Sequence, residues 1–328
     1  MRTRVTELLG IQVPVVQGGL AYLAHADLCA AVSAAGGLGQ LTATTMPSPD
    51  ALREEIRAVR AATDRPFGVN FALGRRDVTD LLAVATEEAV PVVSVTGGDP
   101  APVLERLAAA GFRGRTLVLV SSVRQAVRAE RLGADLVAAV GQEGGGHIGR
   151  NGVGTFVLVP AVAEAVRIPV LAGGGIADAR GLVAALALGA EGVEMGTRFV
   201  ATAECRAHAR YKAALVAAGI EDTTLVEASL GHPGRVLDGP IPRVIRELEA
   251  QGASFEELRP FVRGETNVEG ALGGNLEGGF VWAGQAAGLV RDVPTVAELF
   301  RRLVAEAAAV RERLGRVWPA AAAAGAAP

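Results

Sequence analysis

Residues 116–140 read TLVLVSSVRQAVRAERLGADLVAAV, and this stretch decides the fold. Its two ends, Thr116–Val120 and Leu136–Val140, are short apolar runs rich in Val and Leu, which predict buried strands. Between them, Val123–Leu132 has the 3.6-residue period of a helix. Because neither run alternates apolar with polar residues, we expect both strands to be covered on both faces, as in a parallel sheet. The stretch is therefore interpreted as one βαβ unit.

The same unit repeats over residues 13–217. The other expected strands are Val13–Gln17, Leu38–Thr42, Phe67–Phe71, Val90–Val95, Val170–Ala172 and Gly192–Met195. The other expected helices are Ala26–Ala35, Pro49–Ala62, Val78–Glu88, Ala101–Ala110, Pro160–Val166, Ala179–Leu188 and Ala203–Ala217. Eight such units predict an α/β fold, a closed (β/α)8 TIM barrel. An open doubly wound sheet is the alternative, but the chain has no early Gly-x-Gly-x-x-Gly.

The repeating pattern breaks after residue 217, where we expect a smaller inserted lid or substrate domain over residues 218–289. Within it, Thr223–Leu230 is expected to be extended, Pro242–Gln251 helical, and Asn267–Gly279 an irregular segment rich in Gly and Asn. This insertion is expected to lie over one end of the barrel.

The chain is then expected to return to the barrel. Residues 290–318, which include a long amphipathic helix at Thr295–Arg313, should complete the barrel of residues 1–217. Residues 319–328 are of low complexity and are expected to form a flexible tail.

The composition restricts the class of partner. Half of the 328 residues are hydrophobic and 20% are charged, which is typical of a globular protein. A net charge of −3 and an aromatic content of 4% give no reason to expect nucleic acid or a membrane as partner. We therefore expect a small-molecule substrate.

The two cysteines and the lack of a long apolar run indicate the compartment. Cys29 and Cys205 lie in apolar helical patterns and are expected to be reduced packing residues. The chain has no apolar run near the roughly 20 residues that a membrane-spanning helix needs. A cytoplasmic protein is expected.

Glycine clusters follow three of the expected strands: Gly141–Gly149, Ala172-Gly173-Gly174-Gly175 and Met195-Gly196-Thr197. In a TIM barrel, the loops after strands seven and eight often bind phosphate. Backbone N–H groups, with the N-termini of the following helices, form such a site, and glycine lets the anion approach closely. The alternative is that these glycines only turn strands into helices.

Two further strand ends carry amide side chains. Gln17-Gly18-Gly19 follows the first strand, and Asn70 lies in the third. An amide at the barrel mouth can donate to and accept from the edge of a flavin or purine ring. The alternative is that these amides only cap the adjacent loops.

His147 lies in the first glycine cluster and has three interpretations. It is a structural residue that bonds to backbone, a metal ligand, or a general acid or base. No other histidine has metal-ligand spacing to it, so no metal is expected. Glu143, four residues earlier, either orients His147 or is solvated.

Together, these segments resemble the nitronate monooxygenase (formerly 2-nitropropane dioxygenase) flavoproteins. The likeness covers about residues 3–215, with a weaker echo at Gly279–Val290. It depends on seven motifs that appear in order: Val13–Leu20, Ala34–Gly39, Arg65–Asn70, Gly133–Asp135, Glu143–Gly149, Ala172–Asp178 and Met195–Phe199.

The resemblance implies an FMN-binding TIM barrel with a lid and with His147 as the catalytic residue. It implies that FMN phosphate is held by Gly174, Gly175, Gly196 and Thr197. Valine in place of Gly174 or Gly196 is therefore expected to reduce FMN occupancy more than stability. The full set of implied cofactor-binding residues is Gln17, Gly18, Gly19, Leu20, Asn70, Glu143, Gly145, Gly146, Ala172, Gly173, Gly174, Gly175, Met195, Gly196, Thr197 and Gln285.

The family resemblance leaves the reaction open. The leading interpretation is oxidation of alkyl nitronates with O2, in which His147 holds the anion or takes the α-proton of a nitroalkane. The alternative is an NAD(P)H-dependent reductase of enoyl-acyl-carrier-protein thioesters or quinones. The quinone-reductase branch has a lysine near the end of strand five, where this chain has Thr116–Ser121; Thr155–Pro160 looks more like the nitronate branch. The chain could also assemble into a homodimer.

Overall fold

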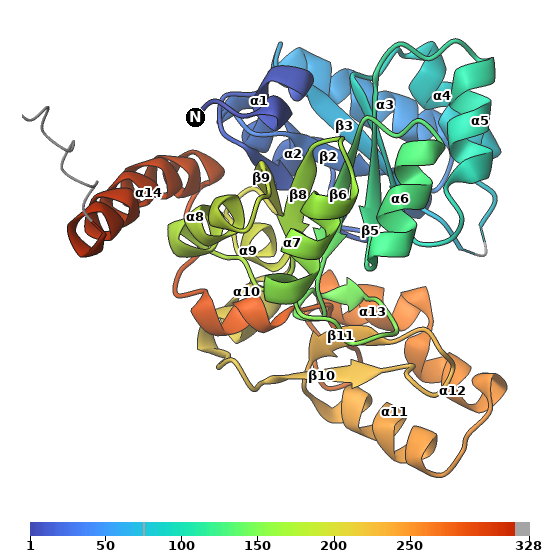
Figure 1. Cartoon of the computed structure of the whole chain (residues 1–328). Coiled ribbons are helices and arrows are strands. Elements are labelled where there is room, and N and C mark those ends of the chain that lie inside the picture. Colours follow the sequence, from blue (N-terminus) through green and yellow to red (C-terminus); the bar gives the residue numbers. More distant parts are fainter. Residues whose placement is uncertain (75, 319–328) are drawn as a thin grey trace, which may run out of the picture.

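Eight parallel strands form a closed barrel in the computed structural model, which describes residues 1–74 and 76–318 (Figure 1). Their order around the barrel is β1-β9-β8-β6-β5-β4-β3-β2, and a bridge between Val16 and Leu38 joins β1 to β2. The bounds are β1 Val15–Gln17, β2 Gly39–Thr42, β3 Phe67–Ala72, β4 Val92–Thr96, β5 Arg115–Val120, β6 Leu136–Val140, β8 Val170–Gly173 and β9 Gly192–Met195. The predicted TIM barrel is confirmed, and the open-sheet alternative is excluded.

The barrel helices follow the predicted pattern closely. They are α2 Ala26–Ala34, α3 Pro49–Ala62, α4 Thr79–Glu87, α5 Ala101–Ala109, α6 Val123–Arg131, α7 Thr155–Ala165, α8 Ala179–Ala187, α9 Thr197–Val200 and α10 Ala209–Ala217, with a short 3-10 turn, η1, at Ala43–Thr45. An additional helix, α1 at Arg4–Leu9, was not expected; Thr3 caps it.

Two predicted helix boundaries are wrong. The helix expected from Pro160 begins at Thr155, because the carboxylate of Glu143 accepts the Thr155 N–H from a distant loop. Periodicity cannot show a cap that is supplied 12 residues away. The helix expected over Ala203–Ala217 is likewise shorter, and α10 begins only at Ala209.

The barrel interior changes character along its axis. Toward the N-terminal end it is filled by apolar side chains on which α1 packs, among them Val16, Leu38, Leu136 and Leu171. Toward the carboxyl ends of the strands, the buried residues are polar and include Gln40, Asn70 and Ser94. The polar end is therefore the end where a barrel of this kind binds ligands.

A smaller lid, labelled with β10, β11 and α11–α13, lies beside the carboxyl ends of the strands (Figure 1). Its antiparallel sheet has the order β10-β11-β7, with β10 at Thr223–Val226 and β11 at Gly234–Leu237. Strand β7, Gly146–His147, comes from the glycine-rich loop after β6 of the barrel. One edge of the lid sheet is therefore supplied by the barrel.

The lid also contains three helices, α11 Pro240–Ala250, α12 Phe255–Val262 and α13 Gly264–Ala271, of which α11 packs on β10. Val226, Val236, Ile245, Leu258 and Phe280 form its core. The irregular segment expected at Asn267–Gly279 is thus wrong in its first part. Asn267 and Gly270 are helical because the helix packs on the Phe280 backbone: the Asn267 side chain donates to Phe280 O at 3.1 Å, and a Cβ at Gly270 would overlap that carbonyl.

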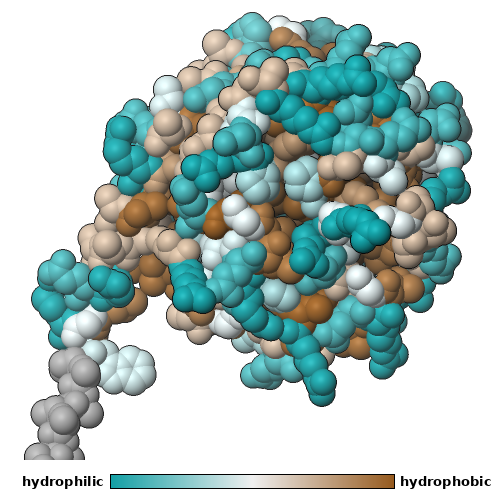
Figure 2. Space-filling view, turned by 90° about the horizontal axis from the view of Figure 1, so that it is seen from above, coloured by the Kyte–Doolittle hydropathy of each residue, from teal (hydrophilic) through white to brown (hydrophobic). Residues whose placement is uncertain are grey.

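The chain then returns to the barrel through a 3-10 turn, η2 at Gln285–Leu289, and the helix α14 at Val296–Val317. Leu299, Phe300 and Leu303 of α14 are buried in the main barrel core. The helix is longer than predicted, and its last turns project from the body in Figures 1 and 2. The predicted tail at 319–328 lies outside the described residues. No helix in the described ranges is long and apolar enough to cross a membrane.

Candidate active site

A network of uncharged polar side chains forms the floor of the barrel mouth. Asn70 Nδ2 donates to Ser94 Oγ and to Thr96 Oγ1, both at 2.8 Å. Ser94 Oγ donates to Gln40 Oε1 at 2.5 Å, and Gln40 Nε2 donates to Gln17 O at 2.9 Å. These groups come from four neighbouring strands, so the network fixes the floor of the mouth as one unit.

The loop after β1 passes directly over this floor. Gln17 Oε1 accepts from the Gln40 N–H, and Leu20 N donates to Thr42 Oγ1 at 2.9 Å. A Cβ at Gly19 would overlap the side-chain oxygen of Asn70, so glycine is required there for close approach. The structure thus brings together Gln17, Gly18, Gly19, Leu20 and Asn70, as predicted for one wall of a ring-binding site.

Glu194 of β9 is a site residue that our sequence interpretation missed. Its side chain is buried beside Gly18, and its Oε1 has no hydrogen-bond partner among the described residues. Burial without a compensating charge raises the pKa of this carboxyl to about 7. The only signal in the sequence was a charged residue inside an otherwise apolar strand, Gly192–Met195.

The expected phosphate loops follow β8 and β9. The amides of Gly174, Gly175 and Gly196 donate no hydrogen bond to another residue in the described ranges, so they are free to bind an anion. The N-terminus of α8 does not join them as expected, because Asp178 caps it by accepting from Arg180 N and Gly181 N.

The glycines of these loops differ in what surrounds them. Gly174 has a left-handed φ of +90°, and a Cβ there would lie 2.9 Å from Thr155 Oγ1 and 3.0 Å from Gly141 O. A Cβ at Gly196 would meet nothing closer than Leu20 Cδ2 at 3.5 Å. For Gly174 we therefore expect valine to cost stability as well as FMN, because the substitution strains the backbone itself.

The side chains of Ala172 and Met195 face the surrounding helices and belong to the main core. Only their backbone atoms remain for contact with a cofactor at the mouth.

Three segments meet behind the phosphate loops. Gln285 N donates to Glu143 O at 2.9 Å, and Gly284 N donates to Thr197 Oγ1 at 2.9 Å. A Cβ at Gly145 would lie 2.6 Å from Gly284 N. The segment Gly279–Val290, which resembles the family more weakly, therefore lies next to the glycine-rich loop after β6 and the loop after β9.

His147 lies where β7 joins the lid sheet. Its Nε2 is 3.2 Å from Glu227 Oε2, and its ring centroid is 5.0 Å from that of Trp282. The His147 side chain is 59% exposed, whereas that of Glu227 is 11% exposed. Glu143 does not orient His147, because both of its carboxylate oxygens accept from Thr155. No motif or spacing in the sequence pointed to Glu227 or Trp282.

The remaining titratable groups show no metal centre. No cluster of three or more His, Cys, Asp or Glu residues within 1–74 and 76–318 could hold a metal ion. Cys29 and Cys205 are free and buried, as predicted, and burial raises the pKa of both thiols.

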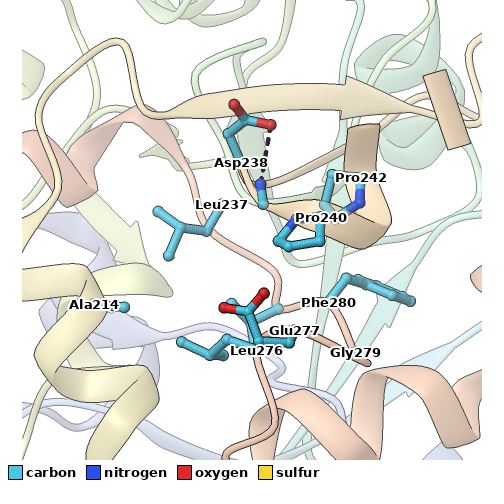
Figure 3. A pocket seen from close by; sticks show the side chains of 11 residues that line it. Ala214, Leu237, Asp238, Pro240, Pro242, Leu276, Glu277, Gly279 and Phe280 are labelled. Atoms are coloured by element: carbon cyan, nitrogen blue, oxygen red, sulfur yellow. Dashed lines mark hydrogen bonds between the residues drawn. The ribbon is translucent and has the colours of Figure 1, made fainter. Parts of the chain in front are cut away.

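Two hollows are lined in part by residues of the lid. One, of about 350 Å³, is lined by Tyr22 of the loop after β1 and by Glu265, Val268 and Glu269 of α13. The other, of about 220 Å³, lies within the lid between Ala214 of α10, the end of β11 and the segment 276–281 (Figure 3). There Asp238 accepts from Gly239 N at 3.0 Å. The first hollow opens between barrel and lid.

The residues at the mouth fit FMN. Unpaired glycine amides suit a phosphate, the Asn70 network suits the polar edge of a ring, and the orphaned Oε1 of Glu194 is a buried polar atom that awaits a partner.

Comparisons with known proteins agree with this geometry. Residues 2–306 match the family model described as nitronate monooxygenase. The nitronate monooxygenase of Pseudomonas aeruginosa is 35% identical, with 93% of this chain and 99% of that protein covered. A (3aS,4S,5R,7aS)-5-hydroxy-7a-methyl-1-oxo-octahydro-1H-indene-4-carboxyl-CoA dehydrogenase of Rhodococcus jostii is 34% identical, with 96% and 98% covered. The structure of FabK from Thermotoga maritima matches with a TM-score of 0.91 and 42% identity, covering 97% of this chain and 99% of that one. The chain belongs to the nitronate monooxygenase family of oxidoreductases.

Proposed function

We propose that this protein is an FMN-dependent enzyme that oxidises alkyl nitronates with O2. The observation that carries the proposal is the position of His147: an exposed imidazole, paired with a buried carboxylate, on the glycine loop beside the barrel mouth. The family assignment and the 35% identical nitronate monooxygenase support it.

In this proposal FMN, when bound, supplies the redox chemistry. The amides of Gly174, Gly175 and Gly196 would hold its phosphate, with Thr197 beside them. The Gln17–Leu20 loop and Asn70 would bind the ring. The polar floor beneath Asn70 keeps its amide oriented, since both of its N–H groups are already donated to Ser94 and Thr96.

His147 would act on the substrate. Its imidazole binds the anionic nitronate, or removes the α-proton when a neutral nitroalkane arrives instead. The Tyr22–Glu269 hollow between barrel and lid would admit a small molecule.

A second candidate is an NAD(P)H-dependent reductase of enoyl thioesters or quinones. The observation that favours it is that FabK, at 42%, and a CoA dehydrogenase, at 34%, resemble this chain as strongly as the nitronate monooxygenase does.

One experiment separates the two. The purified protein should be yellow and should release FMN, not FAD, on denaturation, because the chain has no fingerprint for an adenylate half. Under anaerobic conditions, propyl-2-nitronate should bleach the flavin while NADH and NADPH should not. Bleaching by a pyridine nucleotide alone would support the reductase, and a protein that takes up no flavin would overturn both candidates.

A further inference from the structure

Glu227 is held in an unusual way at the start of the turn between β10 and β11. Its φ is +60°, a left-handed conformation that a residue with a side chain rarely adopts. Its N–H donates to Glu249 Oε2 at 3.2 Å, and the N–H and hydroxyl of Ser229 donate to Glu249 Oε1 at 2.8 and 2.7 Å. Glu249 of α11 therefore clamps the turn in this conformation. A strained residue that its surroundings hold so firmly points to a functional constraint.

The clamped turn aims the Glu227 side chain at the glycine-rich loop after β6, which carries His147. Its Oε2 lies 3.2 Å from His147 Nε2, and Trp282 packs against the same imidazole. The pairing of Gly234 with His147 in the β11–β7 ladder and the bond from Ile148 N to Pro233 O, at 2.9 Å, hold the two loops together.

The chemistry of the pair fixes which nitrogen carries the proton. An ionised carboxylate can only accept, so Nε2 of a neutral His147 must be the donor. His147 Nδ1 makes no hydrogen bond to another residue in the described part of the chain, and the ring is largely exposed. Nδ1 is then the nitrogen with a free lone pair.

We propose that Glu227 is a positioning residue: it holds His147 in the Nε2–H tautomer and so makes Nδ1 the proton acceptor. The inference rests on the proposed function. When a neutral nitroalkane is deprotonated, its α-C–H bond breaks, the proton bonds to Nδ1, and the electron pair is delocalised onto the nitro oxygens. Glu227 balances the imidazolium charge that results.

A second histidine–glutamate pair in this chain provides a matched control. His25 meets Glu55 Oε1 through Nδ1, at 2.8 Å, not through Nε2. The same logic assigns His25 the opposite tautomer, Nδ1–H. Since the chain has only four histidines, nitrogen-15 spectra of the imidazoles can resolve both.

The test is made on the FMN-loaded protein with labelled histidine, at a pH where the imidazoles are neutral. His147→Asn identifies the His147 signals. We expect Nε2–H for His147 and Nδ1–H for His25. Glu227→Gln should mix the tautomers of His147 only, because an amide can either donate or accept, and Glu55→Gln should change His25 only. An Nδ1–H form of His147 in the wild type, or an unchanged tautomer in Glu227→Gln, would overturn the proposal.

Kinetics provide a second readout that a merely structural role would not move. Glu227→Gln should keep its FMN content but lower nitroalkane turnover by about 10- to 100-fold, with a much smaller effect on preformed nitronate, which needs no base. Equal loss on both substrates would contradict a positioning role. If the wild type turns over neither, the proposed function fails, while the tautomer measurement still tests Glu227 independently.

Discussion

The barrel mouth and the lid each bury a glutamate near the site. The carboxyl in the mouth has an oxygen without a partner, whereas the carboxyl in the lid faces an imidazole. Glu194, in the mouth, is buried with an orphaned Oε1, and its pKa is raised to about 7. Glu227, in the lid, is nearly as buried but meets an imidazole and is held by a clamped turn. The difference teaches that burial alone does not set the role of a carboxyl. The mouth keeps a preformed polar floor of amides and hydroxyls, whereas the lid holds its carboxyl against an imidazole.

The largest effect expected from this comparison concerns the group that the lid's glutamate serves. His147→Ala should keep bound FMN but lose ~10²–10⁴-fold in nitroalkane turnover, the usual contribution of a general base. Preformed nitronate has already lost its α-proton and should be affected far less. Steady-state rates on both substrates measure this.

The alternative role of His147 gives a different pattern. If the imidazole only holds the substrate anion, both substrates should suffer alike, through weaker binding. Full activity on both would return His147 to a structural role.

The mouth's glutamate should control the pH dependence of stability. Burial holds the folded-state pKa of Glu194 at about 7, above the 4.5 that is usual for this carboxyl. The stability that the group contributes is therefore fully present below pH 4.5 and is lost as the pH rises through 7. The loss is on the order of 3 kcal/mol. Glu194→Gln has no titrating carboxyl and so lacks this loss. The stability of the variant relative to wild type should therefore increase between pH 5 and pH 8.

Urea unfolding at the two pH values, with and without FMN, measures this difference. Glu221→Gln, an exposed substitution, is the control and should show none. A Glu194→Gln advantage that is the same at pH 5 and pH 8 would contradict a raised folded-state pKa of Glu194.

The sequence was sufficient to predict the barrel but not the contact between His147 and Glu227. The barrel strands are continuous apolar runs, so each was found within two residues of its observed ends. Strand β7 is only Gly146–His147 and owes its pairing to β11, so no local pattern predicts it. Glu227 lies 80 residues from His147 and meets it only because that pairing forms. Helix α13 was missed because its glycine and asparagine serve packing on Phe280.

The phosphate loops offer a test that leaves the lid untouched. Gly196→Val should weaken FMN binding by about 10-fold or more, since a charge-assisted hydrogen bond contributes roughly 1.5–3 kcal/mol. It should cost little stability, because the nearest atom to a Cβ there is 3.5 Å away. Gly174→Val should instead lower both, given its left-handed φ and its contacts. FMN titration and thermal unfolding compare the two; unchanged FMN affinity in Gly196→Val would refute the phosphate assignment.

The smallest expected effect concerns Thr155, which connects the barrel mouth to the loop after β6. Thr155 Oγ1 is 2.9 Å from Glu143 Oε2 and 3.0 Å from both Gly173 O and Gly174 O, so one hydroxyl links the loop after β6 to the loop after β8. Thr155→Val keeps the shape and removes the hydroxyl, while the Thr155 N–H still bonds to Glu143. We expect a loss of about 1 kcal/mol in urea unfolding. Thr86→Val is the control, because the Thr86 hydroxyl donates to Leu82 O within its own helix and, in the described part of the chain, links no separate loops. If both variants lose the same stability, the Thr155 hydroxyl contributes no more than that of an ordinary helical threonine.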